Sequence, residues 1–384
     1  MMNRNRETSQ ERNSLARDRR TRDVRTVVFL GAGASRADGA PLQGELFRDY
    51  FLHYNSRPCD RICHDWDREL ATFFDVFFGI KVDDRASVEH ARFPTFEEVL
   101  GVIELADTQG ESFRDWGTSH IVDAQQKPRL QHMHDVLILL IAEILDRKLR
   151  GNATHHPRLV RLLRDTGQLQ TTSFVSLNYD ILIDNALVGR SGLNLDYSIE
   201  FLNSGADRTR RSAAESNKLF KLHGSLNWLY CPTCRSMRIT PCQKGICRLK
   251  WQPGDCICSK CKTLAVPIII PPSYFKVLSN LYLRQIWHAA EQALLECGRI
   301  VFCGYSFPNA DVHVRYLLKR VEVNGVRPPD VFIVNEHAGK AGTAREAEKD
   351  RYTRFFRDKA RVHWTDLSFE RFCESPTSVI GSTT

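Results

Sequence analysis

Long apolar runs are missing from this sequence of 384 residues. No stretch of about 18 apolar residues occurs, so we expect no membrane-spanning helix. The first 23 residues are polar and rich in arginine, and they contain none of the apolar core that a secretory signal needs. We therefore expect a cytoplasmic protein with a basic, disordered arm over residues 1–23. Such an arm is usually just solvated, although nucleic acid, an acidic partner or a neighbouring subunit could bind it.

The sequence also lacks a Lys-Ser or Lys-Thr pair after its glycine-rich turn, which excludes a Walker A ATPase loop. The turn is GAGAS at 31–35, between an apolar run at 24–30 and a helical pattern. Gly31 and Gly33 permit backbone torsions closed to other residues and let amides approach a pyrophosphate, to which Ser35 adds a hydroxyl donor. A tight strand-to-helix connection without a ligand is the alternative.

Strand-like and helical patterns alternate along the rest of the chain. Apolar runs predict strands at 24–30, 172–177, 299–307 and 330–337, and helical spacing fills most of 60–165. The 42% hydrophobic content is enough for a sizeable core. We expect an α/β fold, a parallel sheet covered by helices, with a helical insertion at about 60–165.

Polar residues follow these predicted strands, where ligands bind in a parallel sheet. They are Asn178, Asp180, Gly304, Ser306 and Asn335. Asn178 can orient a water or hydroxyl, and Asp180 can hold ribose hydroxyls or cap the next helix. A turn at His223 and Gly224 interrupts the strand-like segment 218–230. His223 is a candidate general base, with a buried structural histidine as the alternative.

Cysteines are concentrated in one block. Seven of the 12 lie between Cys231 and Cys261, which argues against a secreted disulfide framework and for metal ligation in a reducing compartment. Two CxxC pairs predict a structural Zn²⁺ site in a module at about 228–265: Cys231 with Cys234, and Cys258 with Cys261. Cys256 could replace Cys258, Cys242 and Cys247 are spare ligands, and an Fe–S cluster is a weaker alternative.

Taken in order, GAGAS, LNYD, KLHGSLNW, CxxC…CxxC, GYSFP and VNE resemble the sirtuin family over residues 24–337. The resemblance implies a Rossmann-like NAD-binding domain over 24–384. Carried over by residue, Gly31, Ala32, Gly33 and Ser35 would contact the cofactor phosphates, and His223 would be the catalytic histidine. Asn178 and Asp180 would lie in the nicotinamide-ribose pocket; Gly304, Ser306 and Asn335 would contact the phosphate and adenosine side.

Three departures separate the chain from deacylating sirtuins. The GIPDFR motif is reduced to a Gly and a Pro at 39–44, QNID is replaced by LNYD, and IIIPPSYFK stands in place of the strand that binds the acyl-lysine peptide. With these changes, the chain resembles the sirtuin-like subfamily whose members hydrolyse NAD in bacterial anti-phage defence. We expect an NAD glycohydrolase with Asn178 and His223 as catalytic residues. The alternatives are an NAD-dependent deacylase or ADP-ribosyltransferase, a non-catalytic nucleotide sensor, and a zinc-stabilised nucleic-acid-binding protein.

An unregulated NAD hydrolase would poison its own cell, so the resemblance also implies control by assembly. We expect a homo-oligomer. Relatives of this kind resemble components that act with a hexameric translocase-type ATPase or a nucleic-acid-guided defence protein, and the arm and the helical insertion are the candidate contacts.

Overall fold

The computed structural model of the chain describes residues 25–55, 65–114, 116, 130–149, 151, 153–188, 194–199, 216–240, 253–269, 280–336 and 342–381. The predicted arm at 1–23 lies outside these ranges. None of the helices within them has both the length and the apolar composition needed to span a bilayer.

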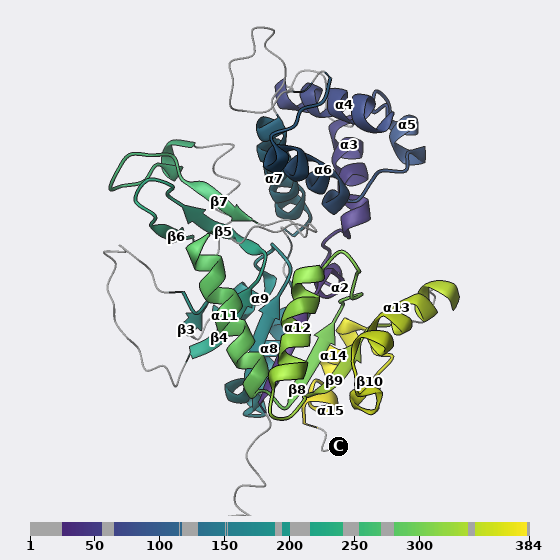
Figure 1. The fold of residues 1–384 in the computed structure, drawn as a ribbon, viewed down its shortest axis with the longest axis vertical. Coiled ribbons are helices and arrows are strands. Elements are labelled where there is room, and N and C mark those ends of the chain that lie inside the picture. Colours follow the sequence, from purple (N-terminus) through teal and green to yellow (C-terminus); the bar gives the residue numbers. More distant parts are fainter. Residues whose placement is uncertain are drawn as a thin grey trace, which may run out of the picture.

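Seven parallel strands form the central sheet (Figure 1). In spatial order they are β10 (Val362–Trp364), β9 (Asp330–Val334), β8 (Arg299–Cys303), β1 (Thr26–Leu30), β2 (Thr172–Ser176), β4 (Ser216–Lys221) and β3 (Asn194–Asp196). The chain builds the sheet outward from β1 through β2, then returns to place β8 on the other side of β1. Every residue of β1 is buried, as expected for an apolar strand covered on both faces.

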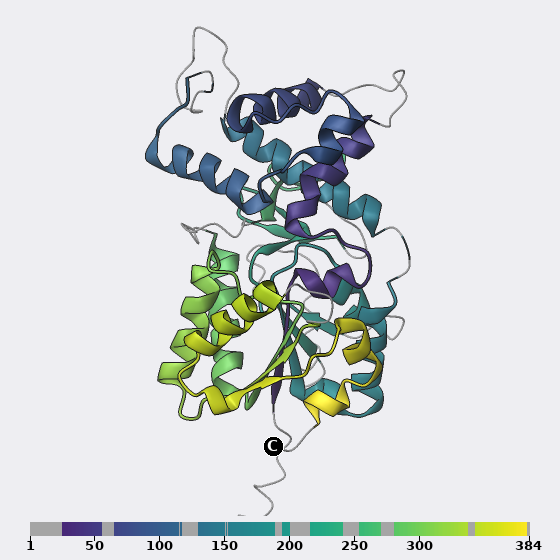
Figure 2. The same ribbon diagram turned by 90° about the vertical axis from the view of Figure 1, so that its right-hand side faces the viewer.

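Helices cover both faces of this sheet (Figure 2). On one face lie α8 (His155–Asp165), α9 (Leu182–Val188) and α14 (Phe369–Glu374), and on the other α11 (Leu281–Glu296) and α12 (Val312–Asn324). The remaining elements of this part are α2 (Ala32–Arg36), α13 (Gly342–Phe355), α15 (Thr377–Ile380) and the 3₁₀ helices η3 (Gln168–Thr171) and η6 (Lys359–Arg361). One core joins sheet and helices, which confirms the predicted α/β class.

A helical module is inserted between α2 and α8, and it packs in a second core that is separate from the core of the large sheet. It contains η2 (Gln43–Glu45), α3 (Leu46–Asn55), α4 (Asp65–Phe78), α5 (Arg85–His90), α6 (Phe96–Gln109) and α7 (Leu130–Lys148). The insertion expected at 60–165 therefore starts earlier and ends earlier than predicted. Leu159 and Leu163 of α8 pack in the core of the sheet instead, and helical spacing alone does not reveal which core a helix faces.

A second, antiparallel sheet lies between the module and the large sheet (Figure 1). Its order is β6 (Met237–Ile239), β5 (Gly224–Tyr230), β7 (Val266–Ile269), with η5 (Pro253–Cys256) alongside. The predicted break at His223 and Gly224 does separate two strands, but they belong to different sheets. Gly224 has a φ of +84°, and a Cβ there would lie 1.9 Å from Ile268 O, so only glycine fits the redirecting turn.

Candidate functional site

Five strands of the large sheet end level with one another. Leu30, the last residue of β1, pairs with Ser176 of β2 and with Cys303 of β8. The same alignment continues outward to Lys221 of β4 and Val334 of β9. Each predicted site residue of the sheet lies one to five residues beyond such an end. These are the carboxyl ends of the strands, and β1 lies where the strand order reverses. Ligands of a parallel sheet usually bind at the carboxyl ends of the strands at such a point. We call this end of the sheet the carboxyl edge.

The glycines of the GAGAS turn serve close packing. Gly31 is extended and Gly33 is helical, so the special torsions expected of them are absent. A Cβ on Gly31 would lie 2.6 Å from Gly304 O, and one on Gly33 would lie 2.8 Å from Gly304 Cα. Gly304, with a φ of +61°, is the residue that needs glycine torsions. The GAGAS and GYSFP turns are therefore packed backbone against backbone.

This packing also uses two backbone amides of the GAGAS turn as hydrogen-bond donors within the protein. Gly31 N donates to Cys303 O at 2.9 Å, and Gly33 N donates to Gly304 O at 2.8 Å. These two amides therefore donate within the protein and not to the pyrophosphate that the sequence predicts at this turn. Ala32, the first residue of α2, has no intrahelical acceptor for its N–H. Among the amides of the turn, that of Ala32 is the one best placed to meet an anion.

Asn178, Ser35 and Asp180 form one hydrogen-bonded unit. The Asn178 Nδ2 group donates to Gly31 O at 2.8 Å and to Ser35 Oγ at 2.7 Å. Ser35 Oγ in turn donates to Asp180 Oδ2 at 2.6 Å. Asp180 Oδ1 accepts from Leu182 N at 3.0 Å, so the helix-capping alternative for Asp180 is also realised. The hydroxyl proton of Ser35 is directed at Asp180, whereas the sequence had suggested a phosphate oxygen.

The orientation of the Asn178 amide follows from its partners. Gly31 O can only accept, so the group facing it must be the donating Nδ2. The Oδ1 atom of Asn178 is therefore turned away from the GAGAS backbone. No hydrogen bond joins that oxygen to another residue in the described part of the chain. It is an acceptor available to a water or a hydroxyl.

His223 lies beside this unit, also at the carboxyl ends of the strands. Asn178 and His223 each lie two residues beyond Ser176 and Lys221, which pair across β2 and β4. Neighbouring strands are about 4.8 Å apart, so the two segments run next to each other. The ring of Tyr179 lies 6.3 Å from the ring of His223, centroid to centroid. His223 is buried, so its ring is shielded from bulk water.

The ends of β8 and β9 are held together by a second buried network. Asn335 Nδ2 donates to Tyr305 O at 2.8 Å and to Glu348 Oε1 at 2.5 Å. The Tyr352 hydroxyl donates to the same Tyr305 O at 2.6 Å. Ser306 is exposed at this end of the site. Asn335 therefore fixes the GYSFP turn through its amide nitrogen, while Ser306 remains accessible.

Four cysteines gather at the tip of the small sheet. The Sγ atoms of Cys231, Cys234, Cys258 and Cys261 all lie within 4.8 Å of one another. Four thiolates about 2.3 Å from a tetrahedral Zn²⁺ would be about 3.8 Å apart, so the set fits the predicted ion. Cys256 does not replace Cys258, because it is fully buried in the core of the helical module. Cys242 and Cys247 lie outside the described residues.

The two CxxC turns have the same local geometry. Arg235 N donates to Cys231 O at 2.9 Å, and Lys262 N donates to Cys258 O at 3.0 Å. Arg235 and Lys262 have positive φ values of 57° and 61°, an uncommon conformation for side-chain-bearing residues. Hydrogen bonds with the Thr263 hydroxyl and backbone lower the pKa of the Cys261 thiol to about 6. Thiolate character of this kind suits a metal ligand.

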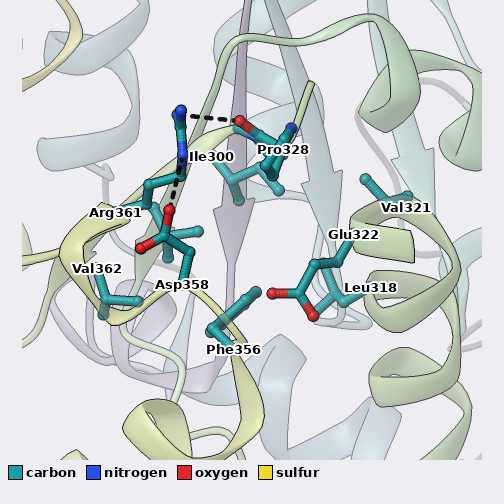
Figure 3. Close-up of a pocket in the computed structure, with 11 residues that line it drawn as sticks. Ile300, Leu318, Val321, Glu322, Pro328, Phe356, Asp358, Arg361 and Val362 are labelled. Carbon is teal, nitrogen blue, oxygen red and sulfur yellow. Dashed lines mark hydrogen bonds and ion pairs between the residues drawn. The ribbon is translucent and has the colours of Figure 1, made fainter. Parts of the chain in front are cut away.

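A pocket elsewhere in the fold is unrelated to this edge (Figure 3). Ile300 and Val331, near the starts of β8 and β9, line it. The pocket therefore lies at the amino ends of the strands, opposite the carboxyl edge. Phe356 and the ion pair of Arg361 with Asp358 form part of its wall. Its cavity volume of about 20 Å³ leaves room for little more than a water molecule.

Comparisons with known proteins match part of this chain to one family model and find solved structures of similar fold. No curated protein matches the chain in sequence. A structure of Sir2 with a p53 peptide and NAD⁺ aligns over 93% of this chain and 93% of its own, with a TM-score of 0.42 and 13% identity. Sir2Tm bound to a propionylated peptide aligns over 93% and 94%, with a TM-score of 0.41 and 14% identity. Residues 172–356, which run from β2 to just beyond α13 and include Asn178, His223 and the four cysteines, match the SIR2-like domain family.

Proposed function

We propose that this protein hydrolyses NAD to nicotinamide and ADP-ribose at the carboxyl ends of β1, β2, β4 and β8. One observation carries the proposal: Asn178 and His223 follow paired strand ends at equal distance, and the Asn178 amide is oriented by Gly31 and Ser35. The match of this segment to the SIR2-like domain supports NAD as the substrate.

The reaction would break the bond between the nicotinamide nitrogen and the ribose carbon. The electron pair of that bond leaves with nicotinamide, and the ribose carbon gains oxocarbenium-like character. Asn178 Oδ1 accepts a hydrogen bond from the attacking water and so orients its lone pair toward this carbon. His223 accepts the proton that the water loses, directly or through a ribose hydroxyl. Burial keeps other water away from the reacting carbon.

The rest of the substrate would extend along the same edge. The GAGAS turn faces the pyrophosphate, chiefly through the Ala32 amide, and Ser35 and Asp180 hold Asn178 in place. The ends of β8 and β9, with Gly304, Ser306 and Asn335, would receive the adenosine side. The four cysteines would bind Zn²⁺ as a structural ion, since all four ligand positions of a tetrahedral ion would be occupied by protein.

The direct test is NAD turnover by the purified full chain, with nicotinamide and ADP-ribose separated by chromatography. We expect both products in equal amounts, and loss of at least about a hundredfold in kcat for Asn178→Ala and for His223→Ala. Asn324→Ala and His288→Ala change exposed residues of the same types on α12 and α11 and should match the wild type. The absence of nicotinamide at every protein concentration would refute the hydrolase function.

The same assay distinguishes the rival activities. An NAD-dependent deacylase would release nicotinamide only when an acyl-lysine peptide is added, and an ADP-ribosyltransferase would transfer ADP-ribose to an acceptor protein. A nucleotide sensor would bind NAD without turnover, with an affinity indifferent to His223→Ala. The loss of the sirtuin peptide strand and GIPDFR residues favours hydrolysis.

For the biological setting, we propose the toxic effector of an anti-phage defence system, active as a homo-oligomer. The partner would be a hexameric translocase-type ATPase or a nucleic-acid-guided protein, with the helical module as the candidate contact. Infected cells carrying the wild-type gene should lose NAD and release fewer phage than cells carrying Asn178→Ala. Equal phage yields from the two would exclude this role.

A further inference from the structure

A buried lysine lies directly behind the Asn178–Asp180 turn. Lys221, the last residue of β4, has no solvent exposure. Its Nζ donates to the backbone carbonyl of Asp180 and pairs with Asp184 Oδ2 at 3.4 Å. An ammonium group inside a protein is costly unless its partners replace the water it has lost. The mechanism proposed above makes no use of this group.

The ion pair is extended by a tyrosine on its far side. Tyr197 donates its hydroxyl proton to Asp184 Oδ1, and Asn227 Nδ2 donates to the Tyr197 oxygen at 3.3 Å. Burial, with the nearby charge of Asp184, raises the pKa of Tyr197, so the tyrosine stays a donor. Asp184 therefore has a partner for each of its oxygens, and Lys221 is held in one position.

A continuous chain of contacts connects this pair to the proposed active site. Lys221 fixes the carbonyl of Asp180, the carboxylate of Asp180 accepts from Ser35, and Ser35 accepts from Asn178. We propose that Lys221 is a positioning residue that anchors the Asn178–Asp180 turn from the protein interior, and so sets where the Asn178 amide oxygen lies. This inference rests on the proposed hydrolase function for its catalytic consequence.

Two variants separate positioning from simple stability. Lys221→Met keeps the shape of the side chain but leaves Asp184 without its cation, so we expect a lower Tm. We also expect kcat for NAD to fall at least about tenfold while KM changes much less, because misplacement of a catalytic group affects the chemical step. Adding Asp184→Asn removes the uncompensated charge, so the double variant should recover Tm but not kcat.

The single variant Asp184→Asn completes the set, since Lys221 can still donate to Asp180 O. We expect it to retain more kcat than either variant without the lysine. Arg299→Met is the matched control for loss of a buried cation: Arg299 is buried at the start of β8 and holds the carbonyl of Val379. It should lower Tm without changing kcat beyond the loss of folded protein.

A second readout does not depend on turnover. Amide hydrogen exchange of the segment 177–182 should accelerate in Lys221→Met and in the double variant, and should be unchanged in Arg299→Met. If the double variant recovers kcat together with Tm, or if exchange of this segment stays at the wild-type rate, Lys221 has only a structural role. Absence of NAD turnover in the wild type would refute the hydrolase function, while the exchange rates would still decide the anchoring.

Discussion

Gly33 shows how local preference and packing oppose each other at one residue. It lies inside α2, where alanine is favoured over glycine by about 1 kcal/mol. A Cβ at Gly33 would, however, meet the backbone of Gly304 at 2.8 Å, and two backbones cannot yield as a flexible side chain would. The cost of overpacking, about 1–3 kcal/mol, exceeds the gain in propensity.

We therefore predict that Gly33→Ala lowers the free energy of unfolding by up to about 2 kcal/mol, the overpacking cost less the gain in helix propensity. Gly44→Ala is the matched control, because Gly44 lies in η2 and a Cβ there would meet nothing within 4 Å. Thermal or urea unfolding of both variants gives the comparison. Equal stability of the two alanine variants would show that the GAGAS and GYSFP turns are not as tightly packed as described.

At the scale of elements, Asp38 ties the two ends of the helical module together. It follows α2, where the chain leaves the sheet, and it accepts hydrogen bonds from the start of α8, where the chain returns. The backbone amides of Thr154, His155 and His156 donate to its carboxylate at 2.8, 3.1 and 3.2 Å, and His156 Nδ1 lies 2.6 Å from Oδ2. One carboxylate thus caps α8 and closes the base of the insertion.

This carboxylate makes stability depend on pH in a defined direction. Burial by itself raises the pKa of Asp38, but the hydrogen bonds from His156 and from the backbone of Thr154 and His155 outweigh it and hold the pKa well below its usual 3.8. As the pH falls, the unfolded chain takes up this proton before the folded one does. The stabilisation is therefore complete above about pH 5 and is lost as the pH falls below 3.8 toward the lowered pKa.

Asp38→Asn should lower the free energy of unfolding at pH 7 by about 1–3 kcal/mol. The asparagine side chain keeps only one of the two oxygens that accept hydrogen bonds from these buried donors. Urea unfolding at a series of pH values is the measurement. The difference between wild type and variant should shrink below pH 4. A difference that stays constant down to pH 3 would contradict the assigned role of the ionised carboxylate.

We expect the stability of the small sheet to depend on its four cysteines. A metal that joined both CxxC turns would hold this end of the small sheet together and so add to its stability. We predict one Zn²⁺ per chain by elemental analysis, lost in Cys234→Ser together with a marked fall in Tm. Cys256→Ala, which changes a buried cysteine outside the cluster, should keep its zinc. Loss of zinc in that variant would reassign the ligands.

At the scale of the whole molecule, the helical module and the proposed active site share a residue. Tyr179 lies between Asn178 and Asp180 in the chain, yet its ring packs in the core of the helical module. The amide of Leu226, from the small sheet, donates to Tyr179 O at 3.0 Å. A partner that shifts the module would therefore act on the Asn178–Asp180 turn through direct packing, which is a physical route for the proposed control by assembly.

Control by assembly predicts that activity per chain depends on protein concentration. Mass photometry should detect oligomers, and NAD turnover per chain should rise as they form. A partner or infection-derived trigger would shift both curves to lower concentration. A chain that remains monomeric and equally active at every concentration would exclude self-assembly as the regulator.

Much of the fold and part of the site could be predicted because they depend on local patterns. Apolar runs followed by polar residues located β1, β2, β8 and β9, and the spacing of two CxxC pairs identified the four gathered cysteines. Those signals require only neighbouring residues. The boundary of the helical module was missed because α8 and α7 have the same helical pattern, although they face different cores.

The sequence by itself determined which residue types end the strands, since strand ends and glycine turns are encoded by a few adjacent positions. Only the tertiary structure decided what those residues do there. Gly33 packs against Gly304, some 270 residues away, and Lys221 anchors Asp180 from a different strand. Such contacts depend on strand order and register, which arise from the burial of the whole core. The role of Asn178 is therefore suggested by its position after a strand, but its orientation is set by partners that no local pattern reveals.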